Sequence, residues 1–193
     1  MTVIRVNKDS VIAYNNTAQG KLSEINAKLS TMLNQTVGVN YTGENAVAFK
    51  TKCADIGVDY SNALRADLRS IVESVNTATS DVVDKLGGVR LSLQLQTSPL
   101  DRPGIPQGDG TYNADLSLLD ALAGDIGRYM NEIEALLDEQ LNALKSTDWT
   151  GQSKERAVAG VSRFTSAAKS KTSEARTNMT KYITEQVNVL RNA

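Results

Sequence analysis

A short motif of an aromatic residue, threonine and glycine occurs twice in this chain and constrains its fold more than any other feature. It stands at Tyr41-Thr42-Gly43 and, 108 positions later, at Trp149-Thr150-Gly151. The same offset places Leu29 on Leu137, and the apolar residues on either side keep that register over some forty positions. A shared register of this length indicates an internal duplication.

Apolar residues recur every three or four positions on both sides of each motif, which is the spacing of one helical face. This pattern predicts a helix over roughly 9–38 and a longer one from the first motif to about residue 86, where two glycines provide a stop. Two more helices are marked by apolar residues from Leu119 to Leu144 and from Val161 to Val189. Helices of this length bury their apolar stripes by packing side by side. The expected fold is therefore all-α, with two tandem antiparallel helical hairpins forming a four-helix bundle.

The segment between the two hairpins differs in character, because it contains all three prolines of the chain. Its first part, residues 89–96, alternates between apolar and polar side chains. Such alternation is typical of an extended strand with one buried face. We therefore divide the chain into a first hairpin over 1–88, a partly extended linker over 89–110 and a second hairpin over 111–193.

The composition excludes several classes of function. A net charge of −1 argues against a nucleic-acid partner, which requires an excess of basic residues. The chain has no histidine, so Ser-His-Asp and Cys-His arrangements and histidine-containing zinc sites are ruled out. We expect no catalytic residues, no metal site, no cofactor and no small-molecule substrate. The single cysteine, Cys53, falls on the inward face of the second helix and is interpreted as a small core residue.

Charge and hydropathy along the chain carry further expectations. Most charged residues in 111–148 are acidic and most of those in 152–193 are basic, which predicts attraction between the third and fourth helices. Exposed ion pairs of this kind contribute only about 0–1 kcal/mol each. No uninterrupted apolar stretch approaches the length of a membrane span. The first eight residues lack the apolar core of a signal peptide, so Sec export is not expected.

The motif itself suits a junction between antiparallel helices. Glycine can adopt backbone angles closed to other residues, and the aromatic ring can cover the end of the hairpin core. The residues before each motif, Asn40 and Asp148, are candidates for capping the following helix, as are Thr42 and Thr150 within the motif. For the two aromatic residues, two roles remain open, a structural plug or direct recognition by a partner. The candidate recognition residues are Tyr41, Gly43, Trp149 and Gly151.

Other features accompany the motif in the first repeat. Residues 4–7 read Ile-Arg-Val-Asn, a helix follows, and Phe49 stands eight positions after the motif tyrosine. The second repeat carries the literal Trp-Thr-Gly but has Ala157 in place of that phenylalanine. Together these features resemble the WXG (ESAT-like) family of small bacterial proteins that are exported by type VII secretion systems.

The resemblance implies a non-enzymatic secretion substrate or export partner, in which one chain mimics the dimer of the family. It implies a monomer with an internal pseudo-dimer, and a protein partner that is either the secretion machinery or a co-secreted protein. It also implies a cytoplasmic stage followed by export to the cell surface or medium along a type VII-like route. The family's export signal, a tyrosine followed four residues later by Asp or Glu, is not met, because Tyr182 is followed at that distance by Gln186.

Two other classes of function stay open. A membrane-active, pore-forming secreted protein would insert its apolar faces into a bilayer, but the low aromatic content and the lack of a basic amphipathic helix disfavour this and any membrane contact. An intracellular structural or adaptor bundle is the second alternative. Only the family motif argues against it.

Overall fold

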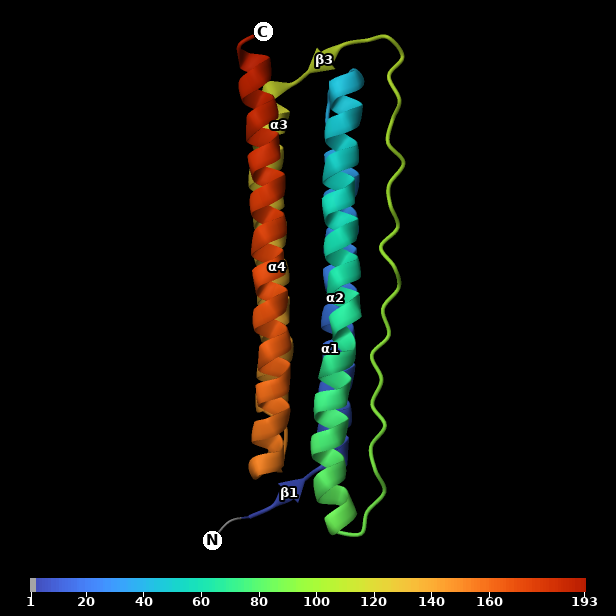
Figure 1. The fold of residues 1–193 in the computed structure, drawn as a ribbon, viewed down its shortest axis with the longest axis vertical. Coiled ribbons are helices and arrows are strands. Elements are labelled where there is room, and N and C mark those ends of the chain that lie inside the picture. Colours follow the sequence, from blue (N-terminus) through green and yellow to red (C-terminus); the bar gives the residue numbers. More distant parts are fainter. Residues whose placement is uncertain (1–2) are drawn as a thin grey trace. The chain divides into compact units, whose positions relative to one another are not determined.

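A computed structural model describes residues 3–193, which form four long helices (Figure 1). Met1 and Thr2, the start of the predicted first hairpin, lie outside the described residues. The helices are α1 (Lys8–Val37), α2 (Glu44–Lys85), α3 (Leu116–Lys145) and α4 (Gln152–Arg191). The predicted all-α fold of the helical-bundle class is confirmed, and the ends of α1 and α2 lie close to those expected from the apolar pattern.

The described residues group into two compact units, and each unit contains one part of all four helices. Unit 1 comprises the residues up to Glu24, Ala63–Ser98 and Ala135–Lys169. Unit 2 comprises Ile25–Asn62, Pro99–Glu134 and Ser170–Ala193. Unit 1 therefore contains the amino-terminal parts of α1 and α4 and the carboxyl-terminal parts of α2 and α3, and unit 2 contains the opposite part of each helix. The division of the chain into 1–88, 89–110 and 111–193 follows sequence order instead and stays a prediction.

Each unit has its own core of aliphatic side chains. In unit 1 the core includes Val11, Ala18, Leu22, Ile71, Val75, Leu137, Leu144 and Val161, and in unit 2 it includes Ile25, Leu29, Met32, Leu119, Ile126, Met130, Ile133 and Met179, all at most 3% exposed. One expected position is wrong, because Val189 is 65% exposed. The buried face of α4 continues through Ile183 and Val187, and a residue two positions further points to another side of the helix.

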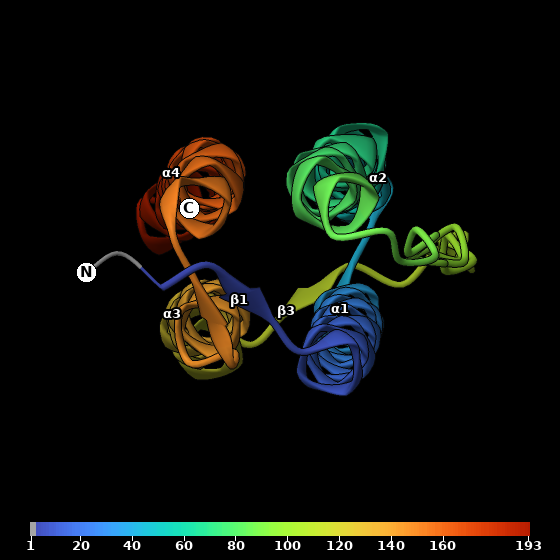
Figure 2. The same cartoon turned by 90° about the horizontal axis from the view of Figure 1, so that it is seen from below.

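Each unit also contains one pair of two-residue strands, and each pair joins residues from the two halves of the chain. In unit 1, β1 (Arg5–Val6) pairs antiparallel with β4 (Trp149–Thr150). In unit 2, β2 (Tyr41–Thr42) pairs in the same way with β3 (Asn113–Ala114). These two pairings correspond at the 108-residue offset, so the duplication extends to the contacts between repeats. Figure 2 shows β1 passing beside the turn between α3 and α4.

The segment between α2 and β3 contains no strand, although its first part follows the predicted alternation. Leu91 and Leu93 are 9% and 7% exposed, whereas the residues on either side of each face solvent. Val89, which begins the alternating pattern in the sequence, is 77% exposed. The prediction of one buried face is therefore confirmed from Leu91 onward and wrong for Val89.

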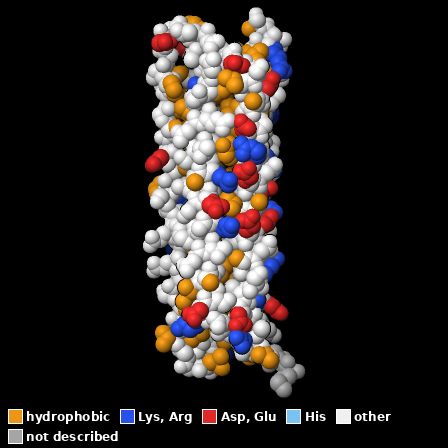
Figure 3. Space-filling model, turned by 180° about the vertical axis from the view of Figure 1, so that it is seen from behind, with side chains coloured by type: hydrophobic (Ala, Val, Ile, Leu, Met, Phe, Trp, Pro, Cys, Tyr) orange, Lys and Arg blue, Asp and Glu red, His pale blue; other side chains and the backbone are white. Residues whose placement is uncertain are grey.

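The acidic residues of α3 pair with basic residues of two different helices. Toward α4, the Nζ atom of Lys169 lies 2.9 Å from the Asp138 carboxylate in unit 1. Toward α1, the Nζ atom of Lys21 lies 2.8 Å from the Glu139 carboxylate in the same unit. Figure 3 shows acidic and basic side chains intermingled on the face over α1 and α3. The ion pair predicted between the third and fourth helices is present, and α3 forms a second ion pair with α1.

Candidate functional site

The two aromatic-Thr-Gly turns are the candidate site, and both depend on their glycine. Gly43 has a φ of +119° and Gly151 a φ of +99°. Side chains of L-residues rarely tolerate this region of backbone conformation. Within residues 3–193, every residue with a positive φ is a glycine. The motif therefore needs glycine for the backbone path that leads from one helix into the next.

The polar residue before each motif binds the strand that pairs with the turn. In unit 1, the Asp148 carboxylate accepts a hydrogen bond of 2.6 Å from the Arg5 guanidinium. In unit 2, the equivalent Asn40 side chain accepts a bond of 2.8 Å from the Asn113 amide. The expectation that these residues cap the following helix is wrong. Their side chains instead fix the strand that comes from the other repeat.

Trp149 is buried in unit 1, with 2% of its surface exposed. Its indole Nε1 donates a hydrogen bond of 2.9 Å to the Ser153 hydroxyl, one turn into α4. Ala157, on the next turn, is fully buried. The indole therefore lies inside the core, where its apolar area and its single donor are both accommodated.

Tyr41 is buried in unit 2, but its surroundings are aromatic. Its ring centroid lies 5.7 Å from that of Phe49, which lies 5.7 Å from that of Tyr182. The Tyr41 hydroxyl donates a hydrogen bond of 3.0 Å to the Gln186 side chain, and burial raises the pKa of this tyrosine. The tyrosine and the glutamine that stand four residues apart on α4 thus both take part in packing this turn.

The two units fill equivalent space with different side chains. Unit 1 has a buried tryptophan and, eight positions later, a buried alanine, whereas unit 2 has a smaller buried tyrosine whose ring contacts that of the buried Phe49. Because packed cores conserve volume, the pairs Trp149 with Ala157 and Tyr41 with Phe49 are alternative solutions for the same position. This explains why the phenylalanine of the first repeat has no counterpart in the second.

A lysine on the following helix binds main-chain carbonyls at each turn. Lys50 is 4% exposed, and its Nζ atom donates a hydrogen bond of 3.0 Å to the Val39 carbonyl. Burial lowers the pKa of this amine. Lys154 binds the Lys145 and Thr147 carbonyls at 2.8 and 2.9 Å. Of the three acceptors only Lys145, the last residue of α3, has a helix-end carbonyl with partial negative charge, whereas Val39 and Thr147 lie within the turns. Both lysines therefore stabilise their turn by binding its main chain.

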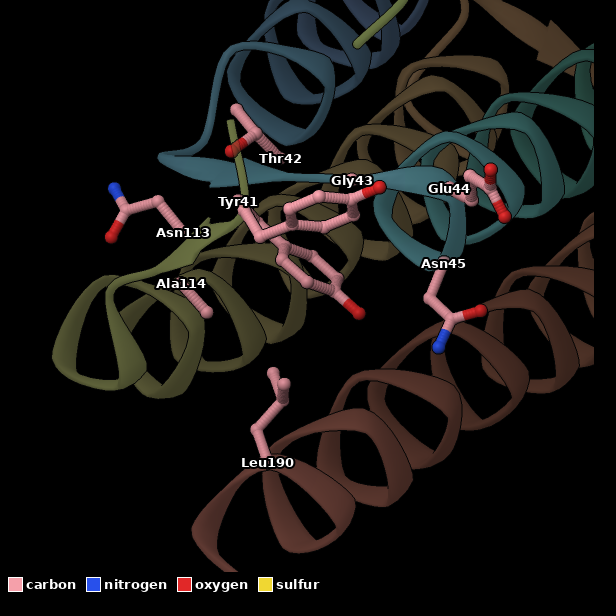
Figure 4. A pocket seen from close by; sticks show the side chains of 9 residues that line it. Tyr41, Thr42, Gly43, Glu44, Asn45, Asn113, Ala114 and Leu190 are labelled. Carbon is pink, nitrogen blue, oxygen red and sulfur yellow. The ribbon is translucent and has the colours of Figure 1, made fainter. Parts of the chain in front are cut away.

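An open pocket of about 360 Å³ lies beside the first turn in unit 2 (Figure 4). Leu190 of α4 and the motif residues face it, and Tyr112, which is 76% exposed, contributes to its lining. The ring of Tyr112 packs on Gly43, where an added Cβ atom would lie 3.0 Å from the ring. The lining consists of Tyr41, Thr42, Gly43, Glu44, Asn45, Tyr112, Asn113, Ala114 and Leu190.

Burial keeps one thiol and two tyrosine hydroxyls of the core in their neutral forms. Burial raises the pKa of Cys53 and of Tyr60 to about 12 and raises that of Tyr14 further. The Tyr60 hydroxyl is hydrogen-bonded at 2.6 Å to Thr172, and the Tyr14 hydroxyl at 3.0 Å to Gln140. Within residues 3–193, no three His, Cys, Asp or Glu side chains are grouped so that they could hold a metal ion.

The candidate recognition residues differ in accessibility. Tyr41, Gly43 and Trp149 are buried and Gly151 is half-buried, whereas the threonine between each ring and its glycine is exposed. No helix in the described part of the chain has an apolar stretch long enough to cross a bilayer. No known protein family, curated protein or solved structure matches this chain.

Sequence reasoning missed several of these contacts. The contribution of Tyr112 to the pocket and the hydrogen bond from Tyr41 to Gln186 join residues far apart in the chain. The only available signal was the 108-residue offset, which relates residues 5–6 to residues 113–114 and could have suggested that equivalent strands exist. The offset alone does not say which turn each strand contacts.

Proposed function

We propose that this chain is a non-enzymatic type VII secretion substrate or export partner that mimics a WXG-family dimer within one polypeptide. The observation that carries the proposal is the relation between the two turns. Each has an aromatic residue, a glycine with positive φ and a strand from the other repeat, in the same order. In a family of dimers, such contacts between repeats correspond to contacts between chains.

The chain departs from the family at the export signal, and the two residues concerned lie at the Tyr41 turn. Tyr182 stands in the tyrosine position of the family's export signal, and Gln186 stands where that signal has Asp or Glu. The first packs on Phe49 and the second accepts the hydrogen bond from Tyr41. The pair that departs from the export signal, Tyr182 and Gln186, therefore contributes to the packing of this turn.

The burial of both aromatic rings limits how a partner recognises these turns. A partner meets mainly the exposed threonines, the main chain and the pocket beside the first turn, which Tyr112 and Leu190 line together with Tyr41. The rings fix the shape of the surface that is recognised. The partner that we infer is a protein of the secretion machinery or a co-secreted protein, and the route leads from the cytoplasm to the cell surface or medium.

Export can be tested directly in a bacterium that has a type VII system. The chain should accumulate in the culture medium when the secretion ATPase is present and remain in the lysate when it is deleted, with a cytoplasmic enzyme as the control for lysis. Retention in the lysate in both strains, or release in both, would contradict the proposal.

Two variants then separate architecture from recognition. Trp149→Phe keeps an apolar ring but loses the hydrogen bond to Ser153. If this variant folds and export ceases, the indole has a role in recognition; if export continues, it is a structural plug. Gln186→Glu places a carboxylate in the signal position, and we expect export to be at least equal to that of the unmodified chain. Glu73→Ala, on an exposed part of α2, is the matched surface control.

A further inference from the structure

The extended segment after α2 is held in an unusual way, by side-chain amides of two helices. The Asn76 side chain on α2 binds one residue twice, accepting from the Leu93 N–H at 2.9 Å and donating to the Leu93 carbonyl at 3.1 Å. The Gln19 side chain on α1 does the same for Gln96, at 2.8 and 2.5 Å. All four bonds go to the main chain of the segment.

A third amide extends this arrangement. The Asn15 side chain, one turn before Gln19 on α1, donates a hydrogen bond of 3.0 Å to the Gln94 carbonyl. We call Asn15, Gln19 and Asn76 the amide clamp, and residues 91–97 the strap. Both belong to unit 1, and Figure 2 shows the strap beside α1 and α2. Because the clamp contacts only backbone atoms of the strap, it does not depend on which side chains the strap carries.

The side chains of the strap supply the rest of the interaction. Leu91 and Leu93 are buried, Leu95 is half-buried, and Ser92 and Gln94 between them are exposed. Main-chain hydrogen bonds combined with burial of alternate side chains are how an exposed sheet edge binds an extended peptide. Here the amide clamp takes the place of the edge strand.

The clamp belongs to the first hairpin alone and is not a product of the duplication. The residues 108 positions after Asn15, Gln19 and Asn76 are an alanine, a glycine and a threonine, none of which has a carboxamide. The amides are therefore present where the strap is present. They are also partly exposed, so water can replace each of these hydrogen bonds when the strap leaves, and the net stabilisation from each bond is small.

We propose that the amide clamp and the surface under Leu91 and Leu93 form a binding groove for an extended peptide with leucine at alternate positions. The strap occupies this groove within the chain, and a segment of the same chemistry from a partner protein binds there when the strap is displaced. The strap indicates which peptides fit the groove, because its alternating leucines and its main-chain hydrogen bonds are the features that the groove contacts. A tethered segment has an effective concentration on the order of millimolar, so it competes strongly with any free peptide. This proposal does not rest on the proposed secretion function.

The test uses the full chain with its strap loosened by Leu91→Asp and Leu93→Asp, which leave the clamp intact. A fluorescent peptide with the sequence of residues 89–98 is titrated against it and followed by anisotropy. We expect the loosened chain to bind this peptide at least about tenfold more tightly than the unmodified chain, in which the strap blocks the groove. A peptide that is N-methylated at Leu93 and Gln96 lacks the two main-chain donors, and its affinity should fall by at least about tenfold.

Variants of the clamp complete the experiment. Adding Asn76→Ala and Gln19→Ala to the loosened chain should abolish binding, whereas Asn188→Ala, an exposed amide on α4, should leave it unchanged. The proposal is overturned if the N-methylated peptide binds as well as the unmodified one, or if the folded, loosened chain does not bind. Loss of helical circular dichroism in the loosened chain also overturns it, because the strap would then be part of the core. Doubling of the molecular mass without peptide binding would assign the groove to a second copy of the chain instead.

Discussion

The substitution Gly151→Ala isolates the backbone contribution of the motif from its packing. An alanine Cβ at this position would lie 4.0 Å from the nearest atom that is not a chain neighbour, the Cγ1 atom of Ile4, which is an ordinary contact. The space is therefore available, but the φ of +99° is not favourable for alanine. Such a conformation costs about 1–3 kcal/mol in a residue with a side chain.

The magnitude follows from two opposing effects. Alanine restricts the unfolded chain and so stabilises the folded protein by about 0.4–1 kcal/mol where the native conformation permits it. Subtracting a stabilisation of about 0.7 kcal/mol, the middle of its range, from a strain of about 2 kcal/mol leaves a net destabilisation of about 1.3 kcal/mol. In a domain of this size that corresponds to a fall in melting temperature of roughly 3–5 °C.

Gly124→Ala is the matched control, because it adds the same atoms in a different conformation. Gly124 lies within α3, is exposed, and has no atom within 4 Å of an added Cβ. Alanine in a helix interior is favoured over glycine by about 0.5–1 kcal/mol, so this variant should be more stable than the unmodified protein. Urea unfolding followed by far-UV circular dichroism measures both. If Gly151→Ala costs no stability, or both variants shift in the same direction, the conformational account of the motif is refuted.

Three further predictions concern the core, a helix cap and the buried thiol. Leu29→Ala and Ile133→Ala should each lower the unfolding free energy by about 2–5 kcal/mol, whereas Lys52→Ala on the surface should change it by less than about 0.5 kcal/mol; similar small effects from all three would contradict the assigned core. Asn7→Ala removes the side-chain oxygen that accepts from the Ser10 N–H at 2.9 Å, and should cost about 0.5–2 kcal/mol in the same assay. Burial raises the pKa of Cys53 from 9.0 to about 12, so burial of the neutral thiol keeps its full stabilising effect below about pH 9, and the free energy of unfolding falls as the pH rises from about 9 toward 12. The native thiol should also resist alkylation at mildly alkaline pH until the protein unfolds, and rapid labelling of the native state would contradict this.

The helices and the turn glycines could be predicted from the sequence because their signals are local or repeated. An apolar residue every three or four positions marks a helical face, and the bounds of α1 and α2 follow from it and from the glycines beyond. The positive φ at Gly43 and Gly151 was suggested by a glycine that recurs at equivalent helix junctions. These features need no knowledge of distant contacts.

The remaining features depend on contacts between distant residues and left no local pattern. Two-residue strands such as β1 and β3 are too short for alternation to be recognised. The alternation after residue 89 did predict a buried face, but nothing in it indicated that Gln19 and Asn76 would bind the main chain in place of a strand. Side-chain amides are frequent on helix surfaces, so only the folded arrangement distinguishes these two from the others.

The central claim is that one chain supplies both hairpins of its own bundle, and its mass in solution tests this most directly. Light scattering coupled to size exclusion at micromolar concentration should give 20.8 kDa, independent of dilution. The two repeats then satisfy each other's apolar surfaces within a single polypeptide. An obligate species of about twice that mass would contradict the claim, because the hairpins would then require a second copy.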